Sequence, residues 1–287
     1  MIKYYCKSLK WSVGVISVIF TFVPESVFGS VIRWDGFCSY VSKLFEGAFN
    51  PGDLNVIANH LLCLIVIHLF LLLIVTGYYK CFRKTVTIKG NDYIVKVKYG
   101  NIFKEKNCKM VISFDECFTT IVGDAPWQIK PTSICGQYLK ANSSLDISHL
   151  IAKAGIIAAS RKSKYRKQDR YTSGTIVPNN NDLLLAFVPL DKDGRGVFSS
   201  YEEYLTCLFA LWKELEKHYA QQDVCISILG AGLTRIGNGM DSFYSQQELL
   251  NMIVKSYQLS PYKLKKPAML RIVCQRCENF SLENVGL

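Results

Sequence analysis

The sequence lacks charged residues in two long stretches near its start. Residues 11–32 contain a single charge, Glu25, and residues 56–79 contain no Asp, Glu, Lys or Arg. A helix needs roughly 20 apolar residues to cross the hydrocarbon core of a bilayer, so both stretches qualify by length. The second is the firmer prediction, because Pro24 and Glu25 interrupt the first. This pattern argues against a purely soluble protein.

The charges that flank the two stretches predict their topology. Lys80, Arg83 and Lys84 directly follow the second stretch, whereas the connecting loop holds two basic and three acidic residues. Because basic residues stay on the cytoplasmic side, we expect a transmembrane hairpin over residues 1–84 with both ends in the cytoplasm. A cleaved signal peptide is the alternative for the first stretch, although residues 27–30 offer a poor cleavage site.

The chain also lacks a disulfide framework, a metal motif and a nucleic-acid-binding signature. Its eleven cysteines are scattered, as expected in a reducing cytoplasm. Cys274 and Cys277 have no second pair or nearby His, so we predict no metal site. No helix-turn-helix, zinc finger or RNA-binding aromatic motif supports nucleic acid as a partner. The net charge of +11 instead fits an anionic leaflet or a polyanionic ligand.

From residue 85 onward, short apolar runs alternate with amphipathic segments. The runs predict strands at residues 85–88, 93–98, 109–114, 183–188, 224–229 and 269–274. Helices are predicted over residues 146–160 and after Ser200 and Ser245, each of which precedes a Glu by three positions as in a capping box. This alternation predicts a layered α/β domain over residues 85–287. We find no internal repeat or long disordered linker.

Glycines and polar residues follow several predicted strands. Ligands of open α/β sheets bind at the carboxyl ends of the strands, so these segments supply the candidate ligand-binding residues. The candidates are Gly100, Asn101, Ile102, Phe103, Asp115, Glu116, Phe118, Ser133, Gly136, Gln137, Gly230, Ala231, Gly232, Leu233, Thr234 and Arg235.

The segment from Gly230 to Arg235 is the strongest of these candidates. Its glycines let backbone N–H groups point into a concavity that favours anions, and the Arg235 guanidinium suits phosphate. It matches neither the Walker pattern nor the dinucleotide glycine spacing, so a tight turn without a ligand is the alternative. Asp115 and Glu116 are adjacent in an extended segment and point in opposite directions, so they do not form a catalytic pair by themselves. We therefore predict no catalytic residue.

Six motifs, taken in order, resemble one branch of the macro-domain family. They are Val-Lys-Tyr-Gly-Asn-Ile-Phe (97–103), Asp-Glu-Cys-Phe (115–118), Ser-Ile-Cys-Gly-Gln (133–137), Arg-Tyr-Thr-Ser-Gly-Thr (170–175), Leu-Leu-Leu-Ala-Phe (183–187) and Leu-Gly-Ala-Gly-Leu-Thr-Arg (229–235). This branch occurs in effectors of bacterial Thoeris anti-phage defence, where two transmembrane helices precede the macro domain. The resemblance implies a three-layer α/β/α macro domain with a mixed sheet, behind a hairpin in the bacterial inner membrane.

The resemblance also implies a function. The macro domain would bind an ADP-ribose-derived signal, of the histidine-linked type in membrane-anchored members, which a partner TIR-domain enzyme supplies. Gly230–Arg235 would wrap the pyrophosphate, and Asn101 stands where the family usually has an adenine-contacting Asp. Catalytic members often carry an Asn-rich loop where this chain has Asp115 and Glu116, which favours binding over hydrolysis. No cofactor is implied.

The expected outcome is membrane disruption and death of the infected cell. One hairpin cannot enclose a pore, so this interpretation requires a homo-oligomer. Two alternatives stay open at this point. One is a membrane-anchored ADP-ribosyl hydrolase or ADP-ribose phosphatase, and the other is a membrane scaffold whose macro fold binds nothing.

Three polar features have open roles. His60 and His68 lie eight residues apart, on roughly one face of the second predicted span, where interhelical contact is favoured over proton conduction. Glu25 beside Pro24 is expected at a kink. The basic run at residues 161–170 is interpreted as a solvated face, with lipid headgroup contact and gating of the pocket as alternatives.

Overall fold

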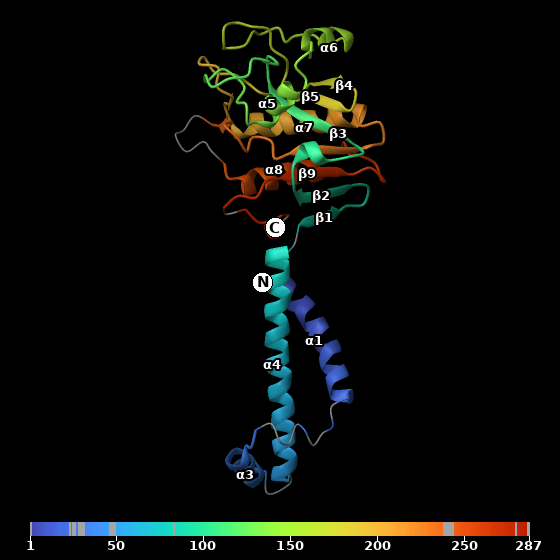
Figure 1. Cartoon of the computed structure of the whole chain (residues 1–287), viewed down its shortest axis with the longest axis vertical. Helices are drawn as coiled ribbons and strands as arrows, with labels where there is room; N and C mark the ends of the chain where they lie inside the picture. Colours follow the sequence, from blue (N-terminus) through green and yellow to red (C-terminus); the bar gives the residue numbers. More distant parts are fainter. Residues whose placement is uncertain are drawn as a thin grey trace. The chain divides into compact units, whose positions relative to one another are not determined.

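The structure is a computed structural model that describes residues 2–22, 24, 27, 32–45, 50–82, 84–237, 244–278 and 280–285. It divides into two compact units, Met1–Arg83 and Lys84–Leu287 (Figure 1). Glu25, with its predicted kink, lies outside the described residues, as does most of the alternative cleavage site at residues 27–30.

The first unit consists of helices α1 (Ile2–Phe22), α3 (Asp35–Leu44) and α4 (Pro51–Phe82). Within α4, the segment Pro51–Ile74 contains an 18-residue window with a mean hydropathy of 2.6 and is long and apolar enough to cross a membrane. The apolar part of α1, Leu9–Phe22, is shorter than such a span. The predicted span at 56–79 therefore coincides with a helix of sufficient length. The predicted span at 11–32 is helical through Phe22, and most of its remaining residues lie outside the part of the chain that the structure describes.

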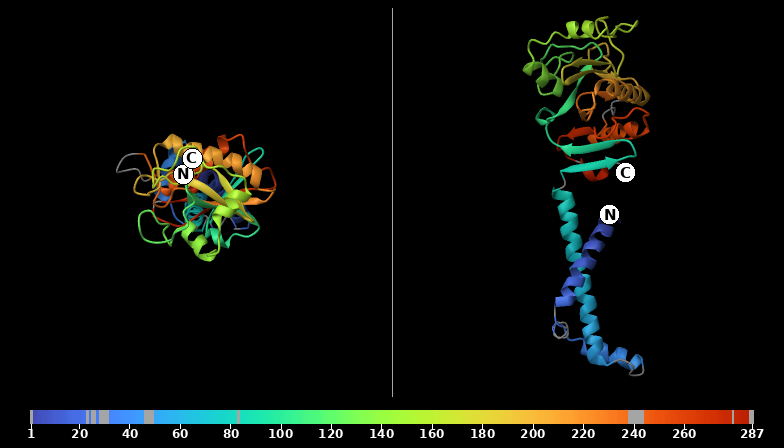
Figure 2. Two further views of the ribbon diagram at one scale, coloured as in Figure 1. Left: turned by 90° about the horizontal axis from the view of Figure 1, so that it is seen from above. Right: turned by 90° about the vertical axis from the view of Figure 1, so that its right-hand side faces the viewer.

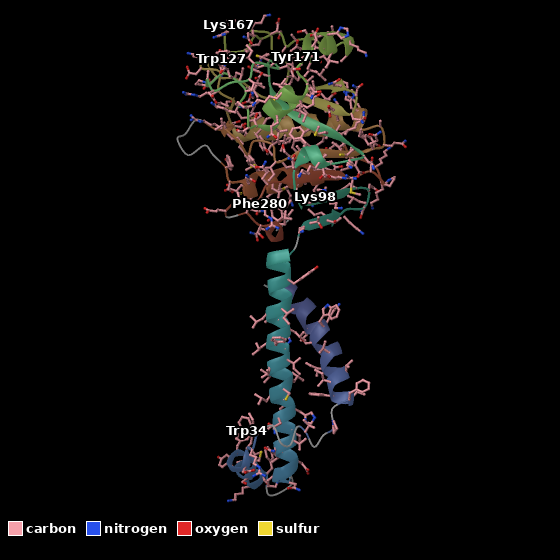
Figure 3. The ribbon with its side chains drawn as sticks, in the orientation of Figure 1. Trp34, Lys98, Trp127, Lys167, Tyr171 and Phe280 are labelled. Carbon is pink, nitrogen blue, oxygen red and sulfur yellow. The ribbon has the colours of Figure 1, made fainter. Side chains whose placement is uncertain are left out.

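Both histidines of α4 contact α1, in agreement with the interhelical contact predicted from the sequence. The Ser12 hydroxyl lies 2.8 Å from Nδ1 of His68, and the Phe20 ring packs edge-on against His60 with 5.0 Å between ring centroids. The eight-residue spacing puts both imidazoles on the α1-facing side of α4. At the start of α4, the fully buried Asn59 accepts a hydrogen bond from Nε1 of Trp34 (3.0 Å) and donates one to the Ile32 carbonyl (2.8 Å), which fastens the segment before α3 (Figure 3).

The second unit is built on one mixed seven-stranded sheet in the order β1-β2-β9-β7-β3-β5-β4. The five middle strands are parallel, and β1 and β4 pair antiparallel at the two edges. The strands are β1 (Thr85–Lys89), β2 (Ile94–Tyr99), β3 (Cys108–Asp115), β4 (Ile176–Asn179), β5 (Asp182–Val188), β7 (Asp223–Ser227) and β9 (Leu270–Cys274). A separate parallel pair joins β6 (Val197–Phe198) to β8 (Arg235–Ile236).

Alternate residues of the central strands enter two different cores, which makes the unit three-layered (Figures 1 and 2). Val111 and Leu183 pack on the face covered by α7 (Tyr201–His218) and α8 (Gln246–Leu259). Ile112 and Leu184 pack on the face covered by α5 (Ile134–Ala141) and α6 (Ile147–Lys153). All six predicted strands are confirmed to within a few residues. The central strands are largely buried on both faces and read as apolar runs, whereas β1 is exposed at alternate residues.

The helices match the sequence less closely. Ser245 and Glu248 form the predicted reciprocal capping box. Ser200 caps α7, but the Glu203 carboxylate accepts from the backbone and hydroxyl of the preceding Ser199 instead of completing the box. The helix predicted over 146–160 ends at Lys153, because Gly155 adopts a left-handed conformation with φ +63° that stops the helix.

Candidate functional site

A cleft of about 680 Å³ opens at the carboxyl ends of the five parallel strands. The segments that follow β2, β9, β7, β3 and β5 all contribute to its lining. Small-molecule sites typically enclose about 300–1,000 Å³, so the cleft has the size of a nucleotide site. Its described lining includes twelve of the sixteen residues predicted from the sequence: Gly100, Asn101, Ile102, Phe103, Asp115, Ser133, Gln137, Gly230, Ala231, Gly232, Leu233 and Thr234.

The glycine loop, residues 230–234, lies after β7 at the middle of the sheet. The Tyr204 hydroxyl donates to the Leu229 carbonyl at 3.0 Å and fixes the start of the loop. Gly230 has φ +89°, a conformation that favours glycine. At Gly232, a Cβ would meet no atom of the described residues within 4 Å, so this glycine faces open space. The loop is therefore held in shape while its backbone stays accessible to a ligand.

Arg235 has a different place from the one expected. It belongs to β8, where its backbone N–H donates to the Gly196 carbonyl at 3.1 Å, and it is absent from the described lining of the cleft. The residue thus ends the glycine loop by pairing it with β6. The phosphate contact by its guanidinium stays a prediction.

Asn101 and Phe103 occupy the β2 end of the cleft. Oδ1 of Asn101 accepts from the Phe103 N–H at 2.9 Å and caps a short 3-10 helix, Ile102–Lys104. The Asn101 amide nitrogen is left to donate to a ligand. Phe103 is 36% exposed and presents a ring for stacking, whereas Ile102 is buried beneath it.

Asp115 and Glu116 point apart, as their extended backbone requires. Asp115 lines the cleft, and its Oδ1 accepts from the N–H groups of Cys117 (2.8 Å) and Thr119 (3.2 Å). Burial raises the pKa of the Asp115 carboxyl, an effect that these hydrogen bonds oppose. Phe118, with φ +51°, turns into the core against Phe114.

Glu116 is 2% exposed and serves the scaffold instead of the cleft. Its Oε1 accepts from the Ser163 hydroxyl (2.5 Å) and the Leu190 N–H (3.2 Å), and its Oε2 pairs with Arg170 (3.2 Å). One buried carboxylate therefore ties together the loop after β3, the basic run and the loop after β5. A predicted ligand residue thus has a structural role.

The segment at residues 133–137 forms the start of α5. Ser133 is the N-cap, and its hydroxyl accepts from the Gly136 N–H at 3.0 Å. Gly136 does not belong to the described lining, and a Cβ there would lie 2.2 Å from the Lys130 carbonyl oxygen. Gly136 is therefore required for close packing, and Ser133 and Gln137 reach the cleft from the helix they help to cap.

Charge in the cleft is sparse. Among its described lining residues, Lys130 is the one basic and Asp115 the one acidic side chain. Burial raises the pKa of the Cys135 thiol well above its ordinary value, so this cleft residue is protonated near neutrality and is a poor nucleophile. An anion here would be bound chiefly by backbone N–H groups and Lys130. The lining suits recognition better than covalent catalysis.

Several lining residues escaped the sequence analysis, among them Trp127, Lys130, Gly194, Gln246 and Gln275. Most belong to irregular loops, which carry no periodic pattern. Ser113 and Ser227 also line the cleft, and each lies near the carboxyl end of its strand. Their position near the strand ends could have identified these two serines from the sequence as residues of the cleft.

The basic run at 161–170 is folded against the rest of the unit. Arg170 pairs with Glu116, and Lys162 pairs with Asp169. The guanidinium carbon of Arg166 lies 5.0 Å from the ring centroid of the cleft residue Trp127. The solvated face is therefore confirmed for five of the six basic residues, which are exposed, whereas Ser163, Tyr165 and Arg170 attach the run to the rest of the unit.

Comparison with known sequences identifies the family. A family described as Thoeris protein ThsA, Macro domain, matches residues 95–275, more than half of the chain. The chain belongs to this family. It is also 30% identical over 231 residues to Thoeris protein ThsA of Bacillus amyloliquefaciens (strain Y2), an alignment that covers 77% of this chain and 76% of the relative. The glycine loop and the segment after β2 both lie within the macro-domain match.

Solved macrodomains are more distant. The Oceanobacillus iheyensis macrodomain with ADP aligns at a TM-score of 0.41 and 11% identity, covering 70% of this chain and 90% of that chain. The macrodomain of Thermus aquaticus DarG aligns at a TM-score of 0.37 and 12% identity, covering 64% of this chain and 98% of that chain.

Proposed function

We propose that this chain is an anti-phage defence effector whose macro domain senses an ADP-ribose-derived nucleotide. The observation that carries this proposal is the cleft at the carboxyl ends of the parallel strands, with an open glycine loop at its centre. Membership of the ThsA macro-domain family supports it. The ligand is of the histidine-linked ADP-ribose type, and a partner TIR-domain protein produces it.

Within this proposal, the pyrophosphate lies against the backbone of residues 230–234 and the adenine lies at the β2 end. Phe103 offers a ring for stacking there, and the amide of Asn101 offers a hydrogen-bond donor. Lys130 supplies the positive charge among the described lining residues. Residues 100–103, 133, 137 and 230–234 bind the ligand. Gly136, Glu116 and Phe118 act by holding the scaffold.

The first unit is the output. Residues 1–84 anchor the chain in the bacterial inner membrane as a hairpin, and residues 85–287 form the cytoplasmic macro domain. The apolar stretch Pro51–Ile74 supports a crossing by α4, and the Ser12–His68 contact supports pairing of α1 with it. Ligand binding shifts the population of a homo-oligomer toward a state in which its hairpins disrupt the bilayer.

The test is calorimetric titration of the full-length protein in detergent with ADP-ribose and histidine-linked ADP-ribose. The paired variants are Gly232→Glu and Gly232→Gln. Both side chains enter open space, but the carboxylate opposes the pyrophosphate, so Glu should abolish binding whereas Gln weakens it less. Liposomes that contain the wild-type protein should leak on ligand addition, and those with Gly232→Glu should stay sealed. Absence of binding by the wild type contradicts the sensor proposal.

A membrane-anchored hydrolase or phosphatase is the second candidate, because Asp115 is a buried carboxyl with a raised pKa that lines the cleft. Mass spectrometry of the ligand after incubation separates the two functions. A sensor returns the ligand intact. A hydrolase converts it, and Asp115→Asn then stops the conversion.

A further inference from the structure

Trp127 is the large aromatic side chain of the loop after β3, and it lines the cleft. The loop around it is tightly bonded. Gly123 and Ile129 pair through their backbones at 3.0 Å, and Oε1 of Gln128 accepts from the Ala125 N–H at 2.9 Å. The indole is therefore presented by a fixed turn, and its position is defined before any ligand arrives.

The basic run supports this indole. The Tyr165 ring stacks on Trp127 with 6.5 Å between centroids and 22° between planes. The guanidinium carbon of Arg166 lies 5.0 Å from each of the two ring centroids, a shorter distance than the one between the centroids. Tyr165 and Arg166 therefore both lie against the indole. Trp127 is only part-buried and also lines the cleft, so the supported ring is available to a ligand (Figure 3).

This support is itself anchored. Tyr165 is 8% exposed, and its N–H donates to the Ser163 hydroxyl (3.2 Å), which in turn donates to Glu116. Arg166 and Lys167 adopt left-handed backbone conformations with φ +49° and +54°. Such conformations are costly for residues other than glycine and persist where the surrounding structure imposes them. The loop is thus held in an unfavourable form that brings Arg166 over Trp127.

The strand order places Trp127 far from the proposed adenine site. Gly194, in the loop after β5, packs so closely on Trp127 that an added Cβ would lie 2.5 Å from the Trp127 Cβ. β5 is four positions from β2 in the sheet, and the glycine loop follows β7 between them. At about 4.8 Å per strand, the two ends of the cleft are roughly 19 Å apart. A dinucleotide-like ligand with its pyrophosphate on the glycine loop therefore carries its terminal group toward Trp127.

We propose that Trp127, backed by Tyr165 and Arg166, is a second ring-binding subsite that selects nucleotides with a planar group on the terminal ribose. This inference rests on the proposed function and specifies its ligand class. Stacking on an aromatic side chain is tolerant of ring type, so imidazole and nicotinamide rings both suit the subsite. Unsubstituted ADP-ribose has no such ring and gains nothing from it.

The test compares three probes on the full-length protein in detergent: ADP-ribose, NAD⁺ and histidine-linked ADP-ribose. Trp127→Ala should weaken binding of at least one ring-bearing probe about 10-fold or more, within the range expected for loss of a stacked ring, and that of ADP-ribose less than about 3-fold. Trp127→Phe should restore most of the loss. Phe103→Ala, at the opposite end, is the matched control and should weaken all three probes by a similar factor. The two ring-bearing probes report which ring is preferred.

Equal effects of Trp127→Ala on all probes, or none, overturn the subsite and leave the proposed function intact. Absence of binding by every probe to the wild type overturns both. If Trp127→Ala melts at a lower temperature, Arg166→Gln replaces it, with the neighbouring Lys167→Gln as its control. Loss of ring preference in Arg166→Gln alone supports the subsite, and unchanged preference refutes the backing role.

Discussion

The Glu116 carboxylate should contribute strongly to the stability of the second unit. In Glu116→Ala, the buried Ser163 hydroxyl and the buried Leu190 N–H lose their acceptor. Each buried donor left unpaired costs about 1–3 kcal/mol, so we expect the two together to cost about 2–6 kcal/mol. The Arg170 side chain is 31% exposed and returns to water, so its lost ion pair adds little.

The assay is thermal unfolding of the full-length protein in detergent, followed by near-ultraviolet circular dichroism. For a unit of this size, 1 kcal/mol corresponds to about 2–4 °C, so the melting temperature should fall by roughly 10 °C. Glu116→Gln keeps an oxygen for both donors and should lose less than half as much. Asp193→Ala removes an exposed ion pair with Arg195 and serves as the control with little effect. A Gln variant as unstable as Ala would show that the charge matters and refute the reasoning from unpaired donors.

Three further substitutions test the roles of Asp115, Gly136 and Gly232. Burial raises the pKa of the Asp115 carboxyl, so this carboxyl stays protonated in the folded protein at pH values where it is ionised in the unfolded chain. The free energy of unfolding therefore falls as the pH rises from the ordinary carboxyl pKa of about 3.9 through the pKa of the folded protein. Asp115→Asn should therefore gain more melting temperature over the wild type at pH 7 than at pH 4; an equal difference at both values contradicts this. Gly136→Ala forces a Cβ to within 2.2 Å of the Lys130 oxygen and should destabilise by more than about 2 kcal/mol, whereas Gly232→Ala meets open space and should change the melting temperature little.

The sequence predicts β3, β5, β7 and β9 well because these strands are largely buried on both faces and therefore read as apolar runs, whereas the edge strand β1 is exposed at alternate residues. The sequence also predicts many of the residues that line the cleft, because the carboxyl ends of parallel strands meet at one edge of the sheet whatever the strand order. The opposite directions of Asp115 and Glu116 follow from the two-residue period of an extended chain. The few residues directly after each strand can therefore be assigned to the cleft from sequence alone.

The misplaced residues depend on contacts between distant segments. Glu116 is a scaffold residue because Ser163 and Leu190 meet it, and neither is signalled near residue 116. Trp127 escaped attention because its partners Tyr165 and Arg166 belong to a run that resembles a solvated charge cluster. Arg235 follows the glycine loop in sequence, yet pairing of β8 with β6 takes its backbone elsewhere. Such long-range contacts have no local signature.

The position of β9 within the sheet has a consequence for synthesis. This strand is the last of the chain's described strands, yet it is inserted between β2 and β7, where Val95 pairs with Leu270 and Leu270 with Val224. On the ribosome, α1 and α4 emerge long before β9 does. The sheet cannot close, nor the glycine loop take its place between its neighbours, until almost the whole chain has been translated. A nascent chain thus has its apolar helices before its sheet is complete, and the cleft forms only in an almost fully translated chain.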